Sequence, residues 1–145
     1  MLPLKLRQQI MNHLEAGDKD SGLPLAQTLI QKFPKYYFNG LAYRSVMSLD
    51  KMEQVQLHPG DCFSGSSNSI DQFFKDNRFD SYTADGIRGV VVEAEISGFD
   101  LNSFLKNESD LFPVADQEDI EVYLSENEVI ALEIHKIIKQ YDYKP

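Results

Sequence analysis

The sequence has few of the residues from which many functional sites are built. Cys62 is the only cysteine among 145 residues, which excludes a disulfide within the chain and suits a reducing compartment. His13, His58 and His135 are scattered along the chain and show no metal-ligand spacing, so no metal is expected. The sequence contains no P-loop and no GxGxxG motif, which leaves the common nucleotide-binding fingerprints absent.

Basic residues and long apolar runs are also scarce. The chain has 14 Lys and Arg against 23 Asp and Glu, a formal net charge of -9, which argues against nucleic acid or an anionic membrane as a partner. Residues 1–17 carry polar side chains every few positions and match neither a signal peptide nor a membrane span. With 42% hydrophobic and 11% aromatic residues, the sequence predicts one folded, soluble domain over residues 1–145.

The hydrophobic pattern predicts an α+β fold. Two N-terminal helices are expected, over residues 4–14 with Gly17 as a stop and over 23–33 with Pro34 as a stop. A further helix is expected in "SIDQFFKDN" and a helical turn in "FDLNSFLKN", while "VADQEDIEVYL" fits either a short helix or a loop.

Strand patterns occupy residues 41–47 and 90–96, where one face would carry Val90, Val92, Ala94 and Ile96. Residues 129–143 fit one face of a helix, whereas 129–134 fit a buried strand equally well. The pattern leaves both interpretations open.

Three stretches carry a resemblance when they are taken in order. "LAYRSV" places Arg44 in a strand pattern, and "CFSGSSNSIDQFF" places Ser64 and Ser66 at a strand end before a helix. "SENEVIAL" then places Glu126 and Glu128 immediately before a strand pattern. Each piece alone is common, but the ordered set resembles the Arg, Ser-x-Ser and Glu-x-Glu signature of the mono-ADP-ribosyltransferases.

The resemblance covers about residues 23–134 and implies a fold and a reaction. The fold would be a mixed, split β-core with an NAD cleft and the N-terminal helices packed on it. The enzyme would transfer ADP-ribose from NAD⁺, its substrate, to a protein side chain and release nicotinamide, without a metal. Gly65 and Ser45 depart from the residues more frequent in the family. Two alternatives therefore stay open, an NAD glycohydrolase and a catalytically silent module that binds a nucleotide or a protein.

The resemblance also implies roles for the charged residues. Glu128 would bind the ribose and stabilise the oxocarbenium ion, while Glu126 would engage the acceptor. Because residues two apart on a strand point to the same side, both are expected to face one cleft. Relatives that modify other side chains more often carry Gln at the position of Glu126. The acid found there therefore indicates an arginine acceptor by resemblance. Arg44 would bind the pyrophosphate with its planar, permanently charged guanidinium.

Other contacts to NAD are expected beside these motifs. Ser45 follows the arginine, Ser64 would hydrogen-bond Glu128 or the ribose, and Ser66 would support the strand edge. Phe73 or Phe74 would stack on nicotinamide, with core packing as the alternative for at least one of them. Such an enzyme is expected to act in the cytoplasm of a phage-infected or target cell, and the sequence leaves its oligomeric state open.

Overall fold

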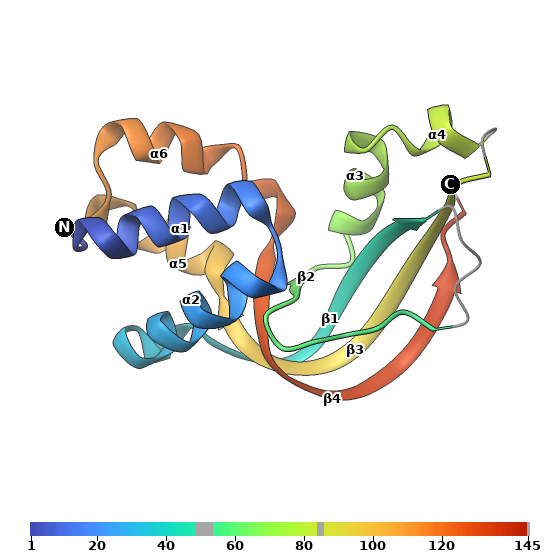
Figure 1. Cartoon of the computed structure of the whole chain (residues 1–145), viewed down its shortest axis with the longest axis horizontal. Helices are drawn as coiled ribbons and strands as arrows, with labels where there is room; N and C mark the ends of the chain where they lie inside the picture. Colours follow the sequence, from blue (N-terminus) through green and yellow to red (C-terminus); the bar gives the residue numbers. More distant parts are fainter. Residues whose placement is uncertain (49–53, 84–85, 145) are drawn as a thin grey trace.

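The structure, a computed structural model, describes residues 1–48, 54–83 and 86–144 (Figure 1). In this part of the chain six helices accompany a four-stranded antiparallel sheet, so the predicted α+β class is confirmed. The sheet closes on itself in the order β1, β2, β4, β3. The three long strands, β1 (Tyr37–Ser48), β3 (Arg88–Asp100) and β4 (Glu128–Asp142), curve together. The short strand β2 (Cys62–Ser64) pairs with β1 on one side and with β4 on the other.

The long strands have the burial expected of β-branched residues on a covered sheet. In β3 the four alternating residues predicted to share a face are all buried: Val90, Val92, Ala94 and Ile96. Val91, on the opposite face, is buried as well and packs against a phenylalanine from each of the short helices α3 (Ser69–Asp76) and α4 (Phe79–Tyr82). Both faces of β3 are therefore covered, which explains its continuous apolar run.

The ambiguous C-terminal run forms the 15-residue strand β4, so the helical interpretation is wrong. β4 pairs with β3 from Val129 opposite Asp100 to Asp142 opposite Val90. The β-branched residues that a helix tolerates poorly pack here against a full-length neighbouring strand.

The prediction of a mixed sheet is wrong, because every strand pairing in the described ranges is antiparallel. Between β3 and β4 the chain forms α5 (Leu101–Asn107) and α6 (Val114–Glu121) at the end of the sheet where β3 finishes. β4 starts at that same end, and a parallel strand would instead have required a crossover to the other end.

The N-terminal helices form as predicted and lie at the end of the sheet where α5 and α6 also lie (Figure 1). α1 (Leu4–Ala16) ends at Gly17, whose φ of 65° is the left-handed conformation that glycine adopts without strain. α2 (Lys19–Lys32) begins four residues before the predicted start, because Asp18 caps it by accepting a hydrogen bond from the Ser21 amide. None of the helices in the described ranges is both long and apolar enough to cross a membrane.

Two glycines let α2 approach the loop before β2. A Cβ on Gly22 would collide with the carbonyl oxygen of Gly60, and a Cβ on Gly60 would collide with that of Lys19. Gly60 also has a φ of +95° and donates its amide to the Ala131 carbonyl on β4 at 2.7 Å. This close approach fixes the helices against the strand that carries Cys62 and Ser64.

Candidate functional site

The predicted motifs meet at a cleft of about 490 Å³. Such a volume lies within the range of small-molecule sites. The residues predicted for catalysis all line this cleft: Arg44, Ser64, Glu126 and Glu128. Ser45 and Phe73 line it too, so six of the eight predicted site residues share one cavity.

Strand pairing explains this convergence. Ser64 on β2 is the register partner of Glu128 on β4 and, on its other side, of Tyr43 on β1. Arg44 follows Tyr43 directly. The short strand β2 thus holds the first and third motifs on either side of the second, although they lie more than eighty positions apart in the sequence.

The two glutamates face one cleft, as predicted, but the geometry differs from a strand. Glu126 ends the 3₁₀ turn η4 (Leu124–Glu126), and Asn127 has a φ of 51°, so β4 begins only at Glu128. Asn127 holds this turn in place, because its carbonyl accepts the Gly65 amide at 3.0 Å and its side chain donates to Ser69 Oγ at 2.8 Å. Burial and then the charge of Glu128 raise the pKa of Glu126.

The side chain of Glu128 contacts a histidine and not the serine motif. Glu128 is 9% exposed, and its Oε2 lies 2.9 Å from His13 Nε2. Ser64 Oγ instead donates to the Ser66 carbonyl at 2.9 Å and accepts the Ser66 amide at 3.2 Å. Ser64 was predicted to hydrogen-bond Glu128 or the ribose, and its side chain bonds to Ser66 in place of the Glu128 side chain, while a contact with the ribose stays a prediction.

Ser66 and Phe74, both predicted to contact NAD, lie outside the residues that line the cleft. Ser66 Oγ accepts the Asn68 amide at 3.2 Å, a bond within the turn between β2 and α3, and its predicted support of the strand edge stays a prediction. Phe74, in α3, is 1% exposed and stacks on Tyr143 with ring centroids 3.9 Å apart. The prediction of a nicotinamide contact is wrong for Phe74, which is a core residue, whereas Phe73 remains in the cleft.

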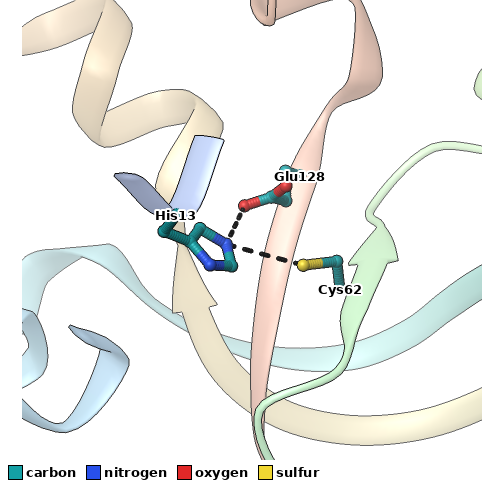
Figure 2. A group of neighbouring side chains, drawn as sticks. All are labelled: His13, Cys62 and Glu128. Atoms are coloured by element: carbon teal, nitrogen blue, oxygen red, sulfur yellow. Dashed lines mark hydrogen bonds and ion pairs between the residues drawn. The ribbon is translucent and has the colours of Figure 1, made fainter. Parts of the chain in front are cut away.

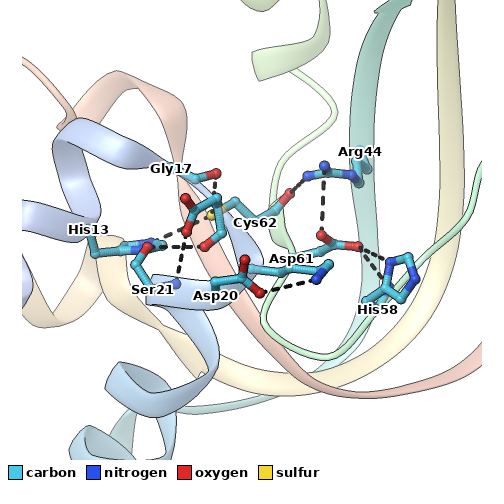
Figure 3. A network of polar contacts seen from close by, with 10 residues as sticks. His13, Gly17, Asp20, Ser21, Arg44, His58, Asp61 and Cys62 are labelled. Atoms are coloured by element: carbon cyan, nitrogen blue, oxygen red, sulfur yellow. Dashed lines mark hydrogen bonds and ion pairs between the residues drawn. The ribbon is translucent and has the colours of Figure 1, made fainter.

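Arg44 joins β1 to the start of β2 (Figure 3). One guanidinium nitrogen donates to the Cys62 carbonyl at 2.8 Å, and the other lies 3.7 Å from Asp61 Oδ1. Asp61 is buried, and its Oδ2 accepts the His58 amide at 2.7 Å. The Arg44 side chain is still 29% exposed and lines the cleft, so it positions β2 and also faces the cavity.

Sequence reasoning treated His13 and Cys62 as isolated, and the structure brings them together with Glu128 (Figure 2). Cys62 Sγ lies 3.5 Å from the same His13 nitrogen that contacts Glu128. A nucleophilic Cys-His-acid triad needs the acid on the opposite ring nitrogen. Burial, with the Glu128 charge second, also raises the pKa of the Cys62 thiol, so Cys62 is not an activated nucleophile.

One signal in the sequence points to His13. It occupies the apolar stripe of α1 between Ile10 and Leu14 and is 0% exposed. A polar side chain in the buried stripe of a helix requires a partner, because an unpaired polar group is costly to bury. The pattern could therefore have marked His13 as paired, without revealing with which residue.

Comparison with protein-family models, with curated proteins and with solved structures found no match to this chain.

Proposed function

We propose that this chain is a mono-ADP-ribosyltransferase that transfers ADP-ribose from NAD⁺ to arginine side chains. The observation that carries the proposal is the meeting of Arg44, Ser64 and Glu128 on three paired strands at one cleft. The three residues also occur in the order and local structure that the family resemblance requires.

Glu128 suits the stabilisation of an oxocarbenium ion. Its Oε2 is held by His13 at 2.9 Å, which leaves Oε1 to accept a hydrogen bond from a ribose hydroxyl. A carboxylate fixed before the substrate arrives needs little reorganisation as positive charge develops on the ribose. Nicotinamide then leaves as a neutral group, and a guanidinium nitrogen of the acceptor bonds to the ribose carbon from the other face as its proton passes to Glu126 and on to solvent.

The charges of the cleft support a cationic acceptor. Its lining includes three carboxylates, Asp76, Glu126 and Glu128, whereas Arg44 is the one Lys or Arg among the described lining residues. A guanidinium pairs with a carboxylate through two parallel hydrogen bonds, and Glu126 at the turn before β4 is placed to form them. Arg44 remains to neutralise part of the pyrophosphate charge of NAD⁺.

Glu128→Gln and Glu126→Gln test this proposal. In Glu128→Gln the new side-chain amide can still donate to His13, so the fold should persist while the negative charge is lost. We expect both protein modification and NAD⁺ hydrolysis to fall by about 10²–10³-fold, the cost of one preorganised electrostatic contact. Glu126→Gln should lose transfer to arginine and keep slow hydrolysis, because water needs less positioning than a guanidinium.

Labelled NAD⁺, with a bacterial lysate or an arginine-rich protein as acceptor, measures both activities in each variant. Glu133→Gln is the matched control, since Glu133 is exposed on β4 and does not line the cleft. Equal, mild effects of the two cleft variants would contradict the proposal. Release of free ADP-ribose without labelled protein would identify an NAD glycohydrolase instead.

A further inference from the structure

Three side chains that bind metals in proteins converge at one edge of the cleft. His13 comes from α1, Cys62 from β2 and Glu128 from β4, and their donor atoms all lie within 4.8 Å of one another. His13 Nε2 lies 2.9 Å from Glu128 Oε2 and 3.5 Å from Cys62 Sγ (Figure 2). Cys62 and Glu128 also line the cleft, so the cluster is open on that side.

Neighbouring hydrogen bonds fix which nitrogen of His13 carries a hydrogen in the neutral ring. The Ser21 hydroxyl donates to the Asp18 carbonyl at 3.1 Å, so its oxygen must accept the 2.8 Å contact from His13 Nδ1. Nδ1 therefore carries the hydrogen, and Nε2 presents a lone pair to the other two side chains.

Those two side chains also present electron pairs to the same point. The Glu128 carboxylate is an acceptor, and the Cys62 thiol is placed to donate to the Gly17 carbonyl at 3.6 Å, away from His13. Nitrogen, oxygen and sulfur lone pairs thus face one another, and a cation placed between them would remove their mutual repulsion. A proton on Nε2 would serve the histidine–glutamate pair, whereas a metal ion would use the sulfur lone pair of Cys62 as well.

We propose that His13, Cys62 and Glu128 bind a zinc ion. Zinc accepts nitrogen, oxygen and thiolate ligands at about 2.0–2.3 Å, which places tetrahedral ligand atoms roughly 3.3–3.8 Å apart. The 3.5 Å separation of Cys62 Sγ from His13 Nε2 already lies in that range, and the 2.9 Å separation of Glu128 Oε2 from the same nitrogen would have to widen slightly. The hydrogen bond from Nδ1 to Ser21 is the kind of support that orients a metal-binding histidine.

The charges and protons of the site balance. Zinc binding displaces the thiol proton of Cys62 to solvent, and the thiolate and carboxylate together neutralise the dication. The neutral complex explains how a site with the buried residues His13 and Glu128 can accept the ion. Because Cys62 and Glu128 line the cleft, water or a substrate group would reach a fourth ligand position from that side.

A consequence for activity rests on the proposed transferase function. A zinc-bound Glu128 cannot stabilise positive charge on a ribose, because the ion has already neutralised it. Zinc should therefore inhibit the enzyme reversibly, and a chelator should restore it.

The decisive measurement is metal binding by the full chain in chelator competition, with Co²⁺ as the spectroscopic probe. The wild type should bind one zinc per chain, and its Co²⁺ complex should show the thiolate-to-metal charge-transfer band in the near ultraviolet. Cys62→Ala should abolish the band and weaken zinc binding more than about 100-fold, while Ser21→Ala should weaken it about 10–100-fold. His135→Gln, at an exposed position in the middle of β4, is the control and should bind as the wild type does.

Absence of stoichiometric zinc binding by the wild type, or unchanged affinity in folded Cys62→Ala, overturns the proposal. If circular dichroism shows Cys62→Ala to be unfolded, the wild-type cobalt spectrum and Ser21→Ala decide. Zinc binding in a chain that never consumes NAD⁺ would refute the transferase proposal and support the zinc site. Turnover of NAD⁺ without zinc binding would refute the zinc site and support the transferase proposal.

Discussion

Two adjacent phenylalanines provide a sharp test, because the fold places one in the core and the other in the cleft. Phe74 is 1% exposed and packs against the rings of Tyr143, Phe79 and Phe73, with centroids 3.9, 5.2 and 5.1 Å away. Phe73 is partly exposed and lines the cleft. Truncation of Phe74 should therefore damage the fold, whereas truncation of Phe73 should mainly damage the binding of NAD⁺.

The expected magnitudes follow from burial. Phe74→Ala removes a fully buried ring with three aromatic neighbours, which costs about 3–5 kcal/mol of the free energy of unfolding. That is a large part of the roughly 5–15 kcal/mol typical of a domain and corresponds to roughly 10–20 °C in Tm. Phe73→Ala should cost only about 1–2 kcal/mol of stability, since its ring is partly in solvent already.

For the binding of NAD⁺, Phe73→Ala should have the larger effect of the two variants. A nicotinamide ring stacked on Phe73 is worth about 0.5–1.5 kcal/mol, so Phe73→Ala should raise the KM for NAD⁺ by about 2–13-fold. Urea denaturation and NAD⁺ titration, both carried out below the Tm of each variant, separate the two effects. Equal losses of stability in the two variants would refute the assignment of Phe74 to the core. An unchanged KM in Phe73→Ala would refute the stacking.

Two further predictions concern the turn before β4 and the C-terminal strand. Asn127→Ala places alanine, which adopts a φ of 51° less readily, at this turn and removes the 2.8 Å hydrogen bond to Ser69. Urea denaturation should therefore show a loss of about 1–3 kcal/mol in the free energy of unfolding. Asn127→Gly loses the same hydrogen bond but adopts the left-handed backbone without strain, so its loss should be smaller. A hydrogen bond to Asp71 raises the pKa of Tyr143 from 10.0 to about 12. The folded state thus holds the phenolic proton more tightly, and the resulting stability is complete below pH 10 and lost as pH rises towards 12. Tyr143→Phe should be less stable than the wild type at about pH 8, and a stability gap that fails to narrow between pH 10 and 12 would contradict this reasoning.

The sequence predicted the elements whose signals are local. The apolar period of α1 and the left-handed Gly17 after it mark one helix, and the β-branched residues of β3 mark one strand. Arg44, Ser64 and Glu128 were predicted to meet at a cleft, and they do. The helical alternative for β4 survived because the spacing of its apolar residues fits either pattern until the full-length pairing with β3 is known.

Other features depend on contacts that no local pattern contains. β4 is antiparallel to β3 because α5 and α6 keep the chain at the end of the sheet where β3 finishes, so that β4 starts from that same end. The left-handed Asn127 breaks the strand alternation that was expected to align Glu126 with Glu128. Phe73 and Phe74 are chemically identical neighbours, and contacts with Val91 and Tyr143, which are distant in the sequence, place Phe74 in the core.

His13 shows most clearly how the site depends on packing at a distance. The helix end that carries it reaches Glu128 only because Gly22 and Gly60 let α2 lie directly on the loop before β2. The same approach brings Cys62 to the histidine, so one contact between backbones positions all three side chains of the cluster. The helical end of the molecule therefore contributes to the chemistry of the cleft, although the family resemblance begins only at about residue 23. A change at Gly22 should alter the behaviour of Glu128 as surely as a change on β4 itself.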